Sequence, residues 1–407
     1  MATAPAPDRL HALDAVRAGA LILGVFFHAS MSFLPGQQVS IVTDVSRSAG
    51  LGVAWFTLHM FRMTTFFLIA GFFAHLVFHR RGPAGFARDR LTRIALPLAV
   101  GWPILFPLIA GAAIWGAAVM NAGVLPERPT PAPRPPFAFP LTHLWFLYVL
   151  LIFYAGALLL RAPVAFVDRD SGLRRGVDAL VRAVMAIPLA PLLLALPAFA
   201  TMASKPVWIV WVGIPTPDNS LVPNAIAFVA YGVAFGFGWL LHRQTDLLPR
   251  FGKNWPIYLA FALAGTAGCL AITGLAPHFQ PIEAGTRKLV AAACYAIAEW
   301  SWCFAFIGAA LAFCAKESPA RRYVADASYW IYLVHLPIVM ALQVAFARLP
   351  LHWAVKYPVI LAIAFAFMLA TYQLLVRYSF IGAVLNGRKQ RPVRSDRRSI
   401  ASAAAKP

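Results

Sequence analysis

Seven ionisable side chains stand inside long apolar stretches of this sequence, where charge is costly, and each is therefore a functional candidate. His28 is the best suited to chemistry, because an imidazole titrates near neutral pH and can take up and return a proton. Arg62 offers a planar fork of hydrogen-bond donors that can hold a developing oxyanion or a carboxylate. The full set is Asp14, Arg17, His28, His59, Arg62, Glu299 and His335.

Arg17 and His28 share one face of a single predicted helix. Eleven residues separate them, which is about 1,100° of helical turn, or about 20° from eclipsed. Asp14, three residues before Arg17, falls on the same face. The helical rise puts His28 about 16 Å further along the axis than Arg17. A charged stripe of this kind has to face a cavity or a neighbouring helix rather than lipid.

The elements that position these side chains are membrane helices. Hydrophobic residues make up 60% of the chain and charged residues 12%, whereas a soluble domain averages just under half apolar and about a quarter charged. A run of about 20 apolar residues crosses the hydrocarbon core as a helix. We predict an all-α polytopic bundle of about ten transmembrane helices, with proline-induced kinks in the third and fifth runs. The ten runs are Leu13–Leu34, Leu51–Phe78, Ile94–Met120, Leu141–Leu160, Ala183–Met202, Val222–Leu241, Pro256–Leu275, Leu289–Cys314, Tyr323–Ala347 and Tyr357–Val376.

The distribution of positive charge predicts the orientation. With a cytoplasmic N-terminus, the inner segments carry 24 Lys and Arg residues and the outer loops carry eight, which is the positive-inside pattern. Both termini are therefore predicted to be cytoplasmic, and we expect the first run to be retained as a helix. The net charge of +20 then reflects these inner segments and contact with anionic lipid, not nucleic acid. We divide the chain into an N-terminal tail (1–12), a membrane domain (13–378) and a basic, disordered tail (379–407).

Four of the ionisable groups fall at similar depth. With this topology, His28 lies about 10 Å below the outer end of its helix, and Arg62 and Glu299 about 15 Å below the outer ends of theirs. His335 lies at about 18 Å. Four ionisable side chains from four helices are thus predicted within one narrow range of membrane depth, as a shared buried site would require. Depth alone does not establish lateral proximity.

Structural roles are alternatives for several of these residues. His59 can serve as a hydrogen-bonding group between helices, and Glu299 can form a structural ion pair with Arg62. Three tryptophans also have two interpretations, a belt at the membrane interface or a platform for a sugar ring. They are Trp145, Trp208 and Trp211.

Five segments, in this order along the chain, resemble the acyltransferase-3 family of membrane enzymes. The first contains the Arg-x10-His pattern of that family at Arg17 and His28, and the third contains an Arg-x-x-Arg pattern at Arg90 and Arg93. The segments are LDAVRAGALILGVFFHAS (Leu13–Ser30), HMFRMTTFFLIAGFF (His59–Phe73), RDRLTRIALP (Arg88–Pro97), HLWFLYVLL (His143–Leu151) and ASYWIYLVHLP (Ala327–Pro337).

The resemblance implies an O-acyltransferase of the bacterial inner membrane. It implies acyl-CoA as the donor from the cytoplasm, a glycan hydroxyl outside the cytoplasm as the acceptor, with an osmoregulated glucan as a candidate, and His28 as the general base. The acyl group can be succinyl or acetyl, and the sequence leaves this open. The predicted site comprises catalytic His28, Arg62, Glu299 and His335, donor-binding Arg17, Arg90 and Arg93, and acceptor-side His59, His143 and Trp145.

No bound cofactor and no metal site are expected. The four cysteines show no CxxC spacing and fall within two neighbouring predicted helices, which indicates neither a zinc site nor a disulfide framework. A proton-coupled secondary transporter is the main alternative, because buried His, Arg and Glu residues in a helix bundle suit proton transport equally well. A non-catalytic membrane partner of a glycan assembly machine is a third possibility.

Overall fold

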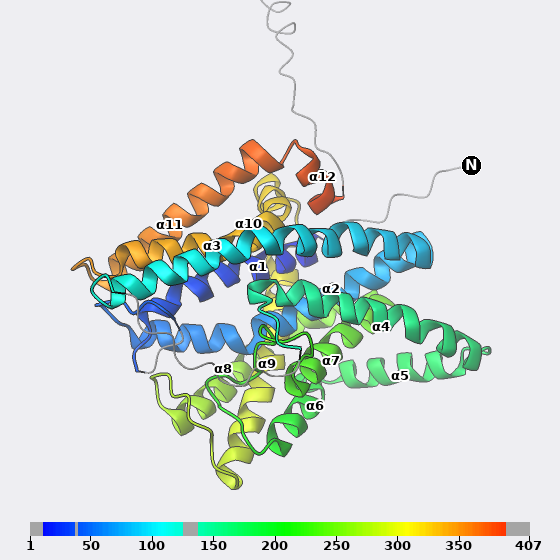
Figure 1. Ribbon diagram of the computed structural model, residues 1–407. Helices are drawn as coiled ribbons and strands as arrows, with labels where there is room; N and C mark the ends of the chain where they lie inside the picture. The colour runs from blue at the N-terminus through cyan, green and yellow to red at the C-terminus, as the bar shows by residue number, and fades with distance from the viewer. Residues whose placement is uncertain (1–10, 37–39, 125–136, 388–407) are drawn as a thin grey trace, which may run out of the picture.

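The computed structural model describes residues 11–36, 40–124 and 137–387, and within these ranges the chain forms twelve α-helices and no strand (Figure 1). The prediction of an all-α helix bundle is confirmed. The helices are α1 (His11–Ser30), α2 (Ala49–Arg90), α3 (Leu96–Met120), α4 (Trp145–Val167), α5 (Gly172–Ala186), α6 (Ala190–Ser204), α7 (Ala225–His242), α8 (Leu248–Thr273), α9 (Thr286–Phe313), α10 (Pro319–Phe346), α11 (Trp353–Thr371) and α12 (Phe380–Asn386).

The lengths of these helices agree with a multi-pass membrane protein. Eight helical segments of the described residues are long and apolar enough to cross a membrane, or nine if the bent pair of α5 and α6 is one span. One of the eight, Ala49–Met120, has 72 residues, which is about 108 Å of helix and enough for two crossings. Counting that segment as two crossings gives nine, or ten, the number predicted, if the bent pair is also one span.

The turn between α2 and α3 has a local cause. Gly82 lies in the left-handed region at φ 67° and is followed by Pro83, and these two residues together break the helical path. The chain then passes through a π-helical segment, η2 (Leu91–Ala95), before α3 begins. In Figure 1, α3 consequently runs back past α2 in the opposite direction.

Of the two predicted kinks, the one in the fifth run is a complete break, whereas α3 continues as one α-helix through Pro103 and Pro107. The run Ala183–Met202 spans the end of α5 and most of α6, and these two helices are bent by 111°. Pro188 lies in the break between them, where a proline removes a backbone donor and clashes with the preceding turn. The fifth run is therefore not one straight span.

Two glycines let α2 and α7 pack backbone against backbone. A Cβ atom on Gly71 would lie 2.0 Å from the carbonyl oxygen of Phe235, and one on Gly238 would lie 1.9 Å from that of Leu68. Small residues at such crossings allow membrane helices to approach closely. α2 also packs on α1, which itself packs on α10.

Ion pairs tie loops together at two opposite ends of the bundle. At the end predicted to be outside, Lys356 pairs with Asp44 at 2.6 Å, and both side chains are buried. At the end predicted to be inside, Arg182 pairs with Asp246 at 2.6 Å. Each pair joins two segments between predicted spans that the charge pattern assigned to the same side, and Arg182 contributes from α5. The contacts therefore support the predicted alternation.

The C-terminal tail differs in part from the prediction. Phe380–Asn386, within the segment expected to be disordered, forms α12. Ser379 begins this helix by accepting a hydrogen bond from the backbone N–H of Ile381 at 3.2 Å, as an N-cap residue does. Residues 388–407 of the predicted tail and residues 1–10 of the predicted N-terminal tail lie outside the described residues.

Candidate active site

A small cavity of about 40 Å³ lies where α1, α2, α4 and α10 meet. It contains three of the predicted catalytic residues and two of the residues predicted on the acceptor side. We call it the histidine cavity. Its polar and aromatic lining includes His28, Arg62, His143, Trp145, Tyr332 and His335.

His28 projects into this cavity from the last turns of α1. Its ring lies 5.2 Å from the ring of His335 and 5.0 Å from that of Phe27, measured between centroids. Its Nδ1 is buried and has no hydrogen-bond partner among the described residues. The backbone carbonyl of His28 accepts a hydrogen bond from the Gln343 amide at 2.9 Å, which fixes this turn of α1 against α10 and leaves the imidazole available.

The other three histidines of the predicted site each form a hydrogen bond with a backbone carbonyl. His335 donates through Nδ1 to the carbonyl of Tyr332 at 2.6 Å, and His143 donates through Nε2 to that of Leu333 at 2.9 Å. His59 does the same with Val212 at 2.8 Å. Because a carbonyl can only accept, each of these bonds fixes the tautomer of a ring and leaves its other nitrogen as an acceptor.

Arg62 supplies the positive charge of the histidine cavity. Its guanidinium lies 4.4 Å from the ring centroid of Phe27, and its Nε is buried without a hydrogen-bond partner in the described part of the chain. A Cβ atom on Gly24 would lie 2.9 Å from Nη1, so a glycine at that position of α1 makes room for the guanidinium. A buried cation held mainly by an aromatic face can bind an anion that forms beside it.

The structure does not bring Glu299 into this group. Its side chain is fully buried and accepts a hydrogen bond from Thr64 at 2.6 Å. Within the described residues it forms no ion pair with Arg62, so the proposed structural pair is absent. Glu299 is also not among the residues that line the histidine cavity there. Similar depth therefore did not mean proximity.

The interpretation of three tryptophans as an interfacial belt is wrong. Trp145, Trp208 and Trp211 are 6%, 2% and 0% exposed, so other helices cover them instead of the membrane interface. Trp145 lines the histidine cavity, as an acceptor-side residue would. His59 instead stacks on Trp55 with ring planes 5° apart, which supports the structural alternative given for it.

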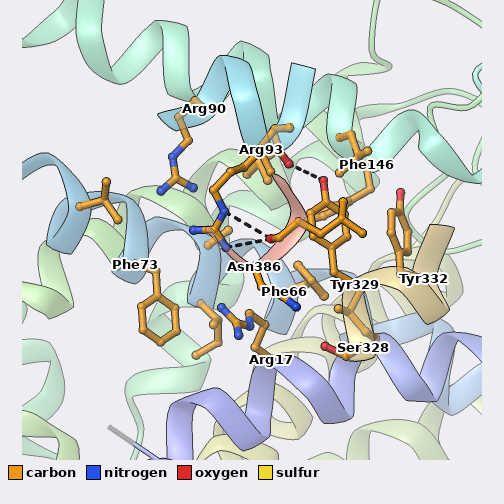
Figure 2. A pocket seen from close by; sticks show the side chains of 18 of the residues that line it. Arg17, Phe66, Phe73, Arg90, Arg93, Phe146, Ser328, Tyr329, Tyr332 and Asn386 are labelled. Carbon is orange, nitrogen blue, oxygen red and sulfur yellow. Dashed lines mark hydrogen bonds between the residues drawn. The ribbon is translucent and has the colours of Figure 1, made fainter. Parts of the chain in front are cut away.

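A larger cavity of about 170 Å³ lies on the inner side of the histidine cavity, and all three predicted donor-binding arginines line it. We call it the arginine cavity. Arg17 reaches it from α1, Arg90 from the end of α2, and Arg93 from η2. Figure 2 shows Arg17 and Arg93 extending toward the cavity from opposite sides.

The two cavities adjoin each other. Four residues line both of them, so one layer of side chains separates the arginines from His28. Tyr332 is the polar member of this layer, and its hydroxyl donates to the backbone carbonyl of His143 at 2.8 Å. The shared residues are Leu21, Phe66, Phe146 and Tyr332.

Each arginine of the arginine cavity has an ion-pair or hydrogen-bond partner. Arg17 pairs with Asp14 at 3.5 Å, and Arg90 pairs with Asp89 at 3.0 Å. Arg93 donates two hydrogen bonds to the backbone carbonyl of Leu385, drawn as dashed lines in Figure 2. These partners hold three guanidinium groups around one space, an arrangement that suits binding of phosphate groups.

Sequence reasoning did not single out the tyrosines of this site. Tyr154 and Tyr329 line the arginine cavity, and Tyr332 lines both cavities. The spacing of Tyr329 and Tyr332, three residues apart in one helix, places both on one face together with His335. This spacing can be read from the sequence alone, so it could have identified Tyr329 and Tyr332 as candidate site residues.

The residues that line the histidine cavity lie in segments that are far apart along the chain, and the family comparison covers all of them. An acyltransferase domain model matches residues 10–373. The chain belongs to the acyltransferase-3 family. His28, Arg62, His143 and His335 come from four of the five segments that resemble this family, and in the fold they line one cavity. This acyltransferase is accordingly a multi-pass membrane protein whose family motifs meet in space.

Similarity to individual acyltransferase-3 relatives is partial. The chain is 31% identical over 105 residues to "Glucans biosynthesis protein C" of Salmonella paratyphi B and, equally, of Salmonella heidelberg. The match covers 26% of this chain and 27% of each relative, so the chain spans about a quarter of the length of these curated relatives. No solved structure matches this chain.

Proposed function

We propose that this protein transfers an acyl group from cytoplasmic acyl-CoA to a hydroxyl of a glycan on the outer side of a bacterial inner membrane. The main observation behind the proposal is that two cavities adjoin each other and are lined by different groups, arginines in one and histidines in the other. The arginine cavity suits the phosphates of a donor, and the histidine cavity holds an available imidazole and a guanidinium. Acceptor and donor then meet at the layer between them.

The donor would enter from the side predicted to be cytoplasmic. Arg17, Arg90 and Arg93 would bind its phosphate groups, because guanidinium forks match phosphate oxygens. Beyond the arginines the lining turns apolar, with Leu147, Leu150 and the shared phenylalanines. Such a lining suits the uncharged pantetheine arm and would lead the thioester to Tyr332.

The chemistry follows from the groups in the histidine cavity. His28 takes the proton of the acceptor hydroxyl as its oxygen attacks the thioester carbonyl carbon. Arg62 stabilises the oxyanion of the tetrahedral intermediate. The carbon–sulfur bond then breaks, and the proton passes from His28 to the departing thiolate. An ester and free CoA result, with protons and electrons balanced.

The size of the histidine cavity favours a short acyl group. A volume of about 40 Å³ corresponds to about three water molecules. An acetyl group fills such a space, whereas a succinyl group adds a methylene and a carboxylate. With acetyl as the acyl group, Arg62 remains free for the oxyanion and does not have to bind a substrate carboxylate.

The acceptor is proposed from the relatives. Two of them carry the name glucans biosynthesis protein C, which supports a glucan as the acceptor of this chain too. No observation in the described residues favours the transporter alternative, and the family match supports acyl transfer instead.

The test uses the purified full-length protein in detergent with labelled acetyl-CoA and several glucan acceptors. We expect labelled glycan from the wild type and at least about 100-fold less from His28→Ala, the effect of losing a general base. His278→Ala is the matched control, because His278 is an exposed histidine outside both cavities. Absence of transfer from any acyl-CoA to any acceptor would refute the proposed function, and transfer by His28→Ala at the wild-type rate would refute the role of His28.

A further inference from the structure

α12 covers the inner side of the arginine cavity. Leu385 and Asn386, the last two residues of this short helix, are part of the cavity lining. Leu385 is only 3% exposed, so the end of α12 is packed into the protein rather than lying on its surface. Figure 2 shows Asn386 between Arg93 and Arg17, at the place where phosphate groups of a donor would bind.

The contact that holds α12 in place uses a predicted donor ligand. Arg93 donates to the backbone carbonyl of Leu385 from Nε at 3.3 Å and from Nη2 at 3.0 Å. The last carbonyls of a helix lack partners within the helix and carry partial negative charge, so a guanidinium caps them favourably. Arg93 thus already holds an acceptor, and that acceptor is a neutral carbonyl.

Two irregular segments meet at α12. Arg93 lies in the π-helical segment η2, and a second π-helical segment, η5 (Tyr372–Val376), precedes α12. A Cβ atom on Gly382 of α12 would lie 2.3 Å from the carbonyl oxygen of Val376, so α12 rests directly on the end of η5. Single π-helical turns are rare and frequently occur at functional sites.

We propose that α12 is a lid on the donor site, held shut by Arg93 and released when a donor phosphate replaces the Leu385 carbonyl. The inference rests on the proposed function, because it requires a phosphate-bearing donor in the arginine cavity. A phosphate carries charge and can accept two parallel bonds from one guanidinium, so it binds Arg93 more strongly than a neutral carbonyl does, which favours the exchange. Arg93 keeps a partner in both states, so neither state leaves it buried without one.

The first test measures hydrogen exchange of the α12 amides in the full-length wild-type protein, with and without saturating free CoA. We expect the amides of 380–386 to exchange at least about tenfold faster with CoA, because the helix loses its capped end. Unchanged or slower exchange while CoA is bound would overturn the lid and leave the proposed function intact. Absence of CoA binding would overturn both.

The second test measures the affinity for free CoA in point variants. Gly382→Ala forces α12 away from Val376, and it should tighten CoA binding about threefold or more, because a larger fraction of molecules is open. Arg93→Gln removes both the latch and the phosphate ligand, so it should weaken binding, and adding Gly382→Ala to it should then have no further effect. Gly111→Ala is the matched control, since a Cβ there meets nothing within 4 Å. Weaker binding by Gly382→Ala alone would mean that α12 is part of the donor site, and would refute the lid.

Discussion

Replacing Gly24 with alanine should disturb the position of Arg62 and little else. The added Cβ would lie 2.9 Å from Nη1 of Arg62, about 0.6 Å closer than an ordinary contact of about 3.5 Å. The guanidinium therefore has to move by roughly that distance. Its donors would then no longer point at the place where the oxyanion forms.

The expected loss of rate can be bounded from two sides. A misplacement of about 1 Å costs about 100-fold, and loss of an oxyanion donor costs about 100- to 1,000-fold. A shift of roughly half that distance should lower the rate of acyl transfer by about 10- to 100-fold. The cost in stability should be modest, about 1–3 kcal/mol, as for one methyl group too many in a packed interior.

Gly19→Ala is a matched control for this change. Gly19 lies on the same helix, and a Cβ there would also meet its neighbour at 2.9 Å, but the neighbour is Cζ of Phe306. Both variants should lose similar thermal stability in detergent, while only Gly24→Ala loses transfer of labelled acetyl groups. If Gly24→Ala keeps the wild-type rate, or if both variants lose activity equally, then Arg62 does not stabilise the oxyanion from its position beside Gly24.

Three further predictions address the acyl group and the fold. The kcat/KM for succinyl-CoA should be at least about tenfold lower than that for acetyl-CoA, because the histidine cavity has room for only about three water-sized groups. Equal kcat/KM values for the two donors would contradict this size argument. Lys356→Met should lower the free energy of unfolding by about 3–5 kcal/mol, because it leaves the buried Asp44 carboxylate without its cation. In the double variant with Asp44→Leu, thermal unfolding measurements should show most of the lost stability restored. Gly238→Ala should lower the free energy of unfolding by about 3 kcal/mol, because the new Cβ forces α7 away from Leu68. Gly236→Ala should be tolerated, because nothing lies within 4 Å of a Cβ at that position. Equal thermal stability of the two variants would argue against backbone contact between α2 and α7.

Part of this protein could be predicted from the sequence, because some of its physics is local. The length of an apolar run fixes whether it can cross a membrane, so nine of the ten runs each lie, to within a few residues, inside one helical segment, whereas the fifth breaks between α5 and α6. Helical geometry places Arg17 and His28 on one face of α1 regardless of the other helices. In the fold they accordingly reach two adjoining cavities, one below the other along α1.

Lateral proximity was decided by the tertiary structure. Depth along a helix put Glu299 level with Arg62, yet it bonds to Thr64 in the packed core, while His143, from the start of the fourth run, reaches the histidine cavity. The place of α12 also depends on the tertiary structure, because the Leu385 carbonyl near the end of this helix accepts hydrogen bonds from Arg93 of a distant segment.

The physical reason is that sequence periodicity describes each helix separately. Which helices touch, and how closely, depends on contacts between distant segments, such as those at Gly71 and Gly238 that bring α2 and α7 together. The sequence by itself therefore determined the spans, their alternation and the charged face of α1. The packing of α1, α2, α4 and α10 decided which of the costly side chains share a site.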